Sequence, residues 1–255
     1  MVRRLRDDGF FRVPSGHRGR RHIGNRVTFT VVIPALDEAR GLPATIGSVW
    51  RAAAGRAVEL LVVDGGSRDG TRRIAGALGA SVCSATGGRG GQLAEGARRA
   101  SGDTVLMLHA DTWLPDDAFA AVERTLRDPE VVGGGFRKSF RDGPASVRRG
   151  SRWRSVMFFV LTGIVLGDQA LFVRRAALER VGGVPVQPLL EDVELSRRLG
   201  TVGRLALADA EVSTSARRFA RRGPLRTWLL MGGVLAGHWL GVPPRILDRW
   251  YRGAA

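Results

Sequence analysis

The amino-acid sequence predicts an α/β fold in which a mostly parallel sheet is flanked by helices. In the first half of the chain, runs that are apolar throughout alternate with helix-compatible stretches, as in parallel sheets that are covered on both faces. Glycine-rich and polar segments follow these runs, where ligand-binding loops lie in such sheets. The length of 255 residues and the 44% hydrophobic content suffice for one large domain.

The first half of the chain contains four expected strands with a helix between each pair. The strands are 28–34 (TFTVVIP), 58–64 (VELLVVD), 80–85 (ASVCSA) and 103–111 (DTVLMLHAD). The helices cover about 40–54, a segment from a cap at Asp69 to Leu78, and a segment from the glycine-rich GGRGGQ (87–92) to about Ala100. This order is a β-α-β-α-β-α-β unit.

The second half is less regular. VVGGGFRKSF (131–140) predicts a strand, and the apolar segment from about 146 to 166 predicts a buried helix. Glu191, Asp192 and Glu194 lie at the start of an amphipathic helix, where acidic side chains stabilise the helix dipole; for one or two of the three this structural role is the alternative to a role in a site.

The charge of the chain is strongly positive, with a formal net charge of +16. Residues 1–27 contribute eight arginines and two aspartates, and we interpret them as a flexible basic tail without the apolar core of a signal peptide. The remaining arginines are scattered and form no recognised nucleic-acid motif, so no specific nucleic acid is expected. A single cysteine, Cys83, favours a cytoplasmic protein.

The apolar stretch 228–242 (WLLMGGVLAGHWLGV) is flanked by arginines on both sides. It is shorter than the roughly 20 residues that cross a bilayer. Two interpretations remain open. The segment lies on the anionic inner face of the cell membrane, or it packs on the core of the protein.

Chemistry-bearing residues gather after the predicted strands. Asp37 and Glu38 follow the first strand, Asp64 ends the second, Arg89 lies in the glycine-rich turn, and His109 and Asp111 end the fourth. Because carboxyl ends of parallel strands meet at one sheet edge, these residues predict a single site. GGRGGQ lacks the Gly-Lys-Ser/Thr ending of a P-loop, and GGSRDG does not fit GxGxxG.

Five segments in this order and spacing resemble a family 2 glycosyltransferase of the GT-A fold: VVIPALDEA, LLVVDGGSRDGT, GGRGGQLAEGARRASGD, LMLHADTWLP and PLLEDVELSRRL. The C-terminal segment from Arg226 resembles a bacterial subgroup with undefined acceptors. The resemblance implies a GT-A domain over 28–215, with a nucleotide-binding half (28–115) and an acceptor half (116–215). A C-terminal amphipathic helical extension over 216–255 follows.

The resemblance also assigns roles to individual residues. Nucleotide binding falls on Pro34, Leu36, Glu38, Asp64, Arg89, His109, Ala110 and Asp111. Leu36 replaces an aromatic residue that often stacks on the base, and His109 stands where the Asp-x-Asp motif has its first acid. Asp111, with His109 as a second candidate, is the expected ligand of Mg²⁺ or Mn²⁺.

The Glu-Asp pair matches the motif that contains the catalytic base. Asp192 is the expected base and Glu191 the residue that positions it or the acceptor. Asp168 is a secondary candidate for acceptor binding, with a turn or helix cap as the alternative.

These assignments predict an inverting, metal-dependent glycosyltransferase that uses a nucleotide-diphosphate sugar and an unidentified acceptor. If the C-terminal segment attaches the enzyme to a membrane, the expected acceptor is lipid-linked. One alternative is a sugar nucleotidyltransferase, whose usual N-terminal glycine-rich Arg/Lys signature PALDEARG does not match. Another is a basic membrane- or nucleic-acid-binding protein with a degenerate active site.

Overall fold

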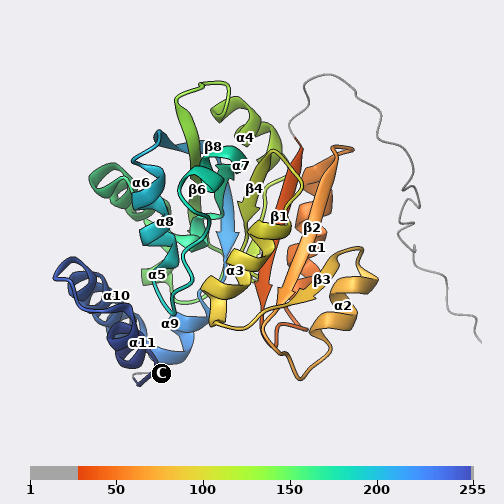
Figure 1. The fold of residues 1–255 in the computed structure, drawn as a ribbon. Coiled ribbons are helices and arrows are strands. Elements are labelled where there is room, and N and C mark those ends of the chain that lie inside the picture. Colours follow the sequence, from red (N-terminus) through yellow and green to blue (C-terminus); the bar gives the residue numbers. More distant parts are fainter. Residues whose placement is uncertain (1–27, 254–255) are drawn as a thin grey trace, which may run out of the picture.

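The computed structural model describes residues 28–253, so the predicted basic tail lies outside the described residues. The described part contains an eight-stranded sheet in the order β3-β2-β1-β4-β7-β6-β8-β5. Its strands are β1 (Phe29–Ala35), β2 (Val58–Asp64), β3 (Ser81–Ser84), β4 (Thr104–Met107), β5 (Thr112–Trp113), β6 (Val131–Phe140), β7 (Leu171–Arg174) and β8 (Arg204–Thr214). In Figure 1, β3 and the C-terminal helices lie at opposite ends of the molecule.

The predicted β-α-β-α-β-α-β unit is confirmed. β1 pairs in parallel with β2 on one side and β4 on the other, and β2 pairs in parallel with β3. The connecting helices are α1 (Leu42–Ala53), α2 (Thr71–Ala77) and α3 (Gly88–Arg99). All seven residues of β1 are buried, which explains its uninterrupted apolar run.

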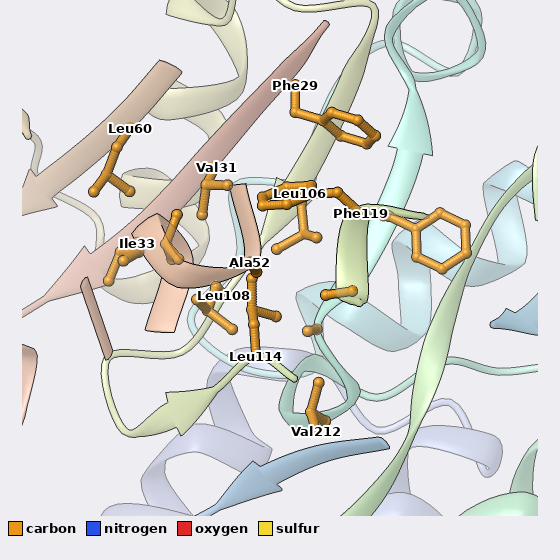
Figure 2. Packing of buried hydrophobic residues seen from close by; sticks show 14 of the residues in the cluster. Phe29, Val31, Ile33, Ala52, Leu60, Leu106, Leu108, Leu114, Phe119 and Val212 are labelled. Carbon is orange, nitrogen blue, oxygen red and sulfur yellow. The ribbon is translucent and has the colours of Figure 1, made fainter. Parts of the chain in front are cut away.

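Two apolar cores lie on the two faces of the sheet. Along β1, Val31 and Ile33 belong to one core and Val32 to the other, because side chains alternate across a strand. Figure 2 shows the first core, where Phe119 and Leu106 lie near Val31. Both faces are therefore covered, as the sequence predicts.

The second half adds the antiparallel part of the sheet, most of which the sequence did not indicate. β7 runs antiparallel to β4 and β6, whereas β6 and β8 are parallel. Strand β5 pairs antiparallel with the end of β8. The other helices are α4 (Ala118–Thr125), α7 (Arg175–Arg180), α8 (Glu191–Leu199), α9 (Arg217–Arg222), α10 (Pro224–Trp239), α11 (Pro244–Gly253) and the 3₁₀ turn η1 (Gly167–Gln169).

The prediction of one buried helix over about 146–166 is wrong in two respects. The segment is divided into α5 (Ala145–Arg148) and α6 (Ser151–Thr162), because Gly150 between them has a left-handed φ of 69°. Moreover, α6 places its small polar residues against the sheet, where the Ser155 hydroxyl accepts a hydrogen bond from the Lys138 N–H at 3.3 Å. Several of its large side chains point outward, and Leu161 is 76% exposed.

The C-terminal helices are buried on one side and exposed on the other. Val234 and Leu247 are buried in a third apolar cluster together with Leu190 of the loop before α8. Leu229 and Trp239, in contrast, are 68% and 61% exposed. Within the described residues, no helix combines the length and apolarity needed to cross a membrane.

Candidate active site

The loop after β1 is fastened to the loop after β2. Asp37 adopts a left-handed φ of 54°, and its carboxylate accepts a hydrogen bond from the Arg68 N–H at 2.8 Å. The Glu38 N–H donates to the Thr71 hydroxyl at 2.9 Å. Next to Asp37, Leu36 is 56% exposed and free to contact a ligand. We call these two joined loops, with the exposed Leu36, the cradle; the sequence predicts nucleotide binding there.

Pro34, Asp64 and Ala110 lie beneath this cradle. Pro34 is buried within β1, one residue before the end of the strand. The buried Asp64 carboxylate accepts hydrogen bonds from the N–H groups of Gly66 and Ser67, so it also holds its own turn in place. The Ala110 carbonyl accepts a hydrogen bond from the α1 residue Thr45 at 2.7 Å.

One residue of this edge carried no sequence signal of its own. Gln92, buried in α3, donates from its amide nitrogen to the carbonyls of Ala35 and Val63 at 2.8 and 2.7 Å. It therefore adds a side-chain link between the carboxyl ends of β1 and β2, beside the pairing of the two strands. A glutamine directly after a glycine-rich turn is the only signal that could have identified it.

Asp111 directly precedes β5 and faces the cradle. Burial raises its pKa, against the opposing effect of the Arg217 guanidinium, whose Nε lies 3.3 Å from the Asp111 Oδ2. Arg141 donates to the Asp111 carbonyl at 2.8 Å and holds the backbone. Glu38, on the other side of Arg217, is paired with the same guanidinium.

His109 lies with a different set of residues. Its Nε2 is 3.3 Å from the Arg89 Nη1, and burial, aided by the Arg89 charge, lowers the pKa of His109 to about 3. The imidazole is therefore neutral at physiological pH, and Nε2 accepts because a guanidinium can only donate. His109 shares a cavity with Gly167, Glu191 and Asp192.

The acidic pair begins α8. Leu190 has a left-handed φ of 61°, which turns the chain sharply before Glu191. Glu191 is 2% exposed and forms an ion pair with Arg89, while its Oε2 has no hydrogen-bond partner. Burial raises the pKa of Glu191, and the Arg89 charge opposes this shift. Asp192 accepts a hydrogen bond from the Gly167 N–H at 2.6 Å.

The glycine-rich turn allows Arg89 to reach Glu191. A Cβ at Gly90 would lie 2.5 Å from the Gln187 carbonyl oxygen in the loop before α8, a distance that no side chain tolerates. Glycine thus lets α3 approach that loop backbone to backbone. Arg89, predicted for the nucleotide, consequently lies beside the acidic pair.

Asp168, the secondary acceptor candidate, is paired with Lys138, the only lysine of the chain. The two side chains are 2.6 Å apart. Although burial raises the pKa of Asp168, the Lys138 ammonium outweighs it, and the net shift is downward. The sequence identified Lys138 as unique but gave no reason to place it at the site.

The predicted metal ligands are not equivalent in the structure. A guanidinium lies against Asp111, which shows that this carboxylate can receive a cation. His109 instead faces Arg89 and Gly167. Within residues 28–253, no group of three or more His, Cys, Asp or Glu side chains could hold a metal ion. One carboxylate fits an ion such as Mg²⁺, which takes one or two carboxylates together with substrate phosphates.

Solved structures with the same architecture support a GT-A fold. The mannosyltransferase PcManGT from Pyrobaculum calidifontis, in complex with GDP-Man and Mn²⁺, aligns over 91% of this chain and 70% of its own with a TM-score of 0.65 and 22% identity. S. aureus TarS 1–349 with UDP-GlcNAc aligns over 74% of this chain and 59% of its own, with a TM-score of 0.58 and 17% identity. Glucosyl-3-phosphoglycerate synthase from Mycobacterium tuberculosis aligns over 85% and 81%, with a TM-score of 0.58 and 24% identity.

These likenesses concern the fold, because all three identities are low. The chain spans about three fifths of the TarS 1–349 chains and 38% of the longer TarS chain. The sequence itself matches the model of glycosyl transferase family 2 over residues 30–177, which is more than half of the chain. The matched segment contains the cradle, Arg89, His109, Asp111 and Asp168. The chain belongs to glycosyl transferase family 2.

Proposed function

We propose that the enzyme transfers a sugar, with inversion, from a nucleoside-diphosphate donor to an acceptor hydroxyl, and that it needs a divalent cation. The main support is geometric. The Asp111 carboxylate faces the cradle between the loops after β1 and β2, and the turn His109–Asp111 connects it to a second group of side chains that contains Glu191 and Asp192. The proposed donor-binding residues thus lie on one side of the turn, and the proposed base lies on the other.

Asp192 is the proposed base. The acceptor oxygen forms a bond to the anomeric carbon while the bond from that carbon to the diphosphate breaks. The proton of the acceptor hydroxyl passes to Asp192, and the electron pair leaves with the diphosphate. The Gly167 N–H fixes the Asp192 carboxylate through its hydrogen bond to Oδ2, and a carboxylate retains further lone pairs for the proton.

Glu191, Arg89 and His109 position the base rather than exchange protons. The ion pair with Arg89 fixes the buried Glu191, and the neutral His109 contacts the other end of the same guanidinium. Asp111 would hold the divalent cation together with diphosphate oxygens. When bound, the cation neutralises charge on the departing diphosphate. His109 stays a predicted second ligand.

The donor base and sugar can be identified by turnover. The enzyme is incubated with UDP-, GDP-, CDP- and dTDP-sugars and Mn²⁺, with water as the acceptor, and release of nucleoside diphosphate is measured. We expect turnover with one base, a loss of at least about a hundredfold in Asp192→Asn, and unchanged turnover in the surface control Glu179→Gln. Full turnover by Asp192→Asn would contradict the assignment of the base. Proton NMR of the sugar before it mutarotates reports inversion or retention.

An anionic membrane is the proposed source of the acceptor, which would be lipid-linked. Exposed apolar side chains lie on α6, on α10 and its C-terminal cap, and on α11, among them Leu161, Leu229 and the cap residue Leu240, which are 76%, 68% and 84% exposed. Contacts connect the helices: Arg154 of α6 lies over the Trp228 ring at 5.1 Å, and Phe158 packs in the cluster of Val234. The exposed Arg245 and Arg249 of α11 add positive charge.

Vesicle co-sedimentation tests this attachment. Removal of the C-terminal helices would expose the third cluster, so substitutions at exposed positions are the better probe. We expect the wild type to bind phosphatidylglycerol vesicles and not phosphatidylcholine vesicles, and Leu229→Ser with Leu240→Ser to bind several times more weakly. Equal binding by the double variant would remove the proposal.

A further inference from the structure

Arg217, the first residue of α9, joins two carboxylates of the proposed donor site. Its terminal nitrogens donate to both oxygens of Glu38, one of them at 2.9 Å, and its Nε lies 3.3 Å from the Asp111 Oδ2. Glu38 comes from the loop after β1 and Asp111 from the turn before β5. One guanidinium therefore spans the mouth of the cradle.

The backbone before Arg217 is fixed on both sides. The Ser215 N–H donates to the Asp111 carbonyl at 3.3 Å, and the Ser215 hydroxyl donates to Asp142 at 2.8 Å. The Ala216 N–H donates to the same Asp142 carboxylate. The start of α9 is thus tied to the site, and the remaining freedom belongs to the long Arg217 side chain.

The exposure of the three side chains shows which one can move away when a ligand binds. Glu38 and Asp111 are 15% and 20% exposed, whereas Arg217 is 53% exposed. A ligand that enters from solvent meets the guanidinium before it meets the carboxylates. An arginine also binds phosphate oxygens as readily as carboxylate oxygens, through the same planar pair of N–H donors.

The charges of Arg217, a divalent cation and the donor diphosphate determine which of them can bind together. A divalent cation on Asp111 would lie close to the Arg217 charge, and like charges at this separation repel. A diphosphate removes this conflict because it brings negative charge for both cations. Cation and diphosphate would then bind together more readily than the cation alone.

We propose that Arg217 occupies the cation position of Asp111 in the donor-free enzyme and moves onto the donor diphosphate when diphosphate and divalent cation arrive. This exchange rests on the proposed function, since it requires a nucleoside-diphosphate donor. It makes Arg217 a donor-binding residue outside the predicted set. It also delays metal binding until a diphosphate is present.

The first test uses Mn²⁺ alone, followed by the loss of the free-ion EPR signal on titration of the full chain. We expect weak binding in the wild type and about tenfold tighter binding in Arg217→Gln, because the competing charge is gone. The matched control is Arg40→Gln, which removes an exposed arginine beside the cradle and should bind Mn²⁺ like the wild type. Arg217→Lys keeps a positive charge and should remain weak. Unchanged or weaker Mn²⁺ binding in Arg217→Gln would overturn the exchange.

The second test uses inorganic pyrophosphate with Mg²⁺ in isothermal titration calorimetry. Here the expected change is opposite: Arg217→Gln should bind about tenfold more weakly, and Arg217→Lys should be intermediate because it lacks the planar fork. A purely structural role would weaken both ligands or neither. Equal pyrophosphate affinity in the wild type and Arg217→Gln would overturn the exchange. A wild type that binds Mn²⁺ but no pyrophosphate would instead overturn the proposed donor class.

Discussion

Gly167→Ala is the substitution that tests the proposed base most sharply. Gly167 lies between His109 and Asp192, in the 3₁₀ turn before β7. A Cβ at this position would lie 2.7 Å from the His109 Nε2 and 3.1 Å from the Asp192 Oδ2. Gly167 does not have a positive φ, so alanine brings a steric conflict at the site without a backbone penalty.

The expected magnitude follows from these distances. Both contacts are shorter than ordinary van der Waals separations, so the two side chains must shift by several tenths of an ångström. Overpacking of this kind costs about 1–3 kcal/mol, which lowers Tm by about 3–10 °C in a domain of this size. A misplacement of about 1 Å can reduce turnover about a hundredfold. We therefore expect turnover to fall at least about tenfold, with a stability loss that leaves the protein folded.

The assay combines donor hydrolysis with urea unfolding. The control is Gly232→Ala in α10, where an added Cβ meets no atom within 4 Å and the helix favours alanine. It should keep wild-type turnover and gain up to about 1 kcal/mol. If Gly167→Ala has wild-type turnover and stability, Asp192 is not held by the Gly167 turn and the reasoning fails.

Three further predictions concern stability. His109 is neutral in the fold, with a pKa of about 3 against 6.5 in the unfolded chain, so the unfolded chain binds the extra proton between these pH values. The free energy of unfolding should therefore fall from pH 6.5 towards 3, by at most about 1.4 kcal/mol per pH unit. In urea unfolding across this pH range, the fall should be steeper for the wild type than for His109→Gln. Gln92→Leu removes two hydrogen bonds to buried carbonyls, of which that of Ala35 keeps the Gly65 N–H as a donor, and should cost about 1–2 kcal/mol in urea unfolding, with no cost refuting its role. Lys138→Met leaves the Asp168 carboxylate unpaired and should destabilise the protein by about 3 kcal/mol at pH 8. The loss should be smaller at pH 5, where the unpaired Asp168 can take up a proton, and an equal loss at both pH values would contradict the ion pair.

The parallel half of the fold follows closely from the sequence. β1 and most of β2 are buried on both faces, so their residues are predominantly apolar and the pattern is clear. The antiparallel half gives no such pattern. β5 has only two residues and β7 only four, shortly after the segment predicted as an apolar helix, so only long-range pairing identifies them.

The candidate site was predictable where residues follow strand ends and not where packing decides their partners. Asp111 and Glu38 lie close to one another at the sheet edge, as the strand order implies. In the predicted strand 103–111, His109 and Asp111 would point to the same face because side chains alternate, but β4 ends at Met107 before either residue and the two side chains lie among different partners. Arg217 is separated from Glu38 by 179 positions, and no local pattern brings them together.

Binding of a nucleoside diphosphate with a divalent cation is the most direct test of the account. Thermal unfolding is measured with UDP, GDP, CDP and dTDP, each with Mn²⁺, with Mg²⁺ and with chelator, for the wild type and Asp111→Asn. A ligand at a hundred times its Kd stabilises the fold by about 2.7 kcal/mol, or about 5–10 °C here. The account predicts such a shift for one base, only with metal, and its loss in Asp111→Asn. No shift with any nucleotide, or an equal shift with chelator and in Asp111→Asn, would contradict it.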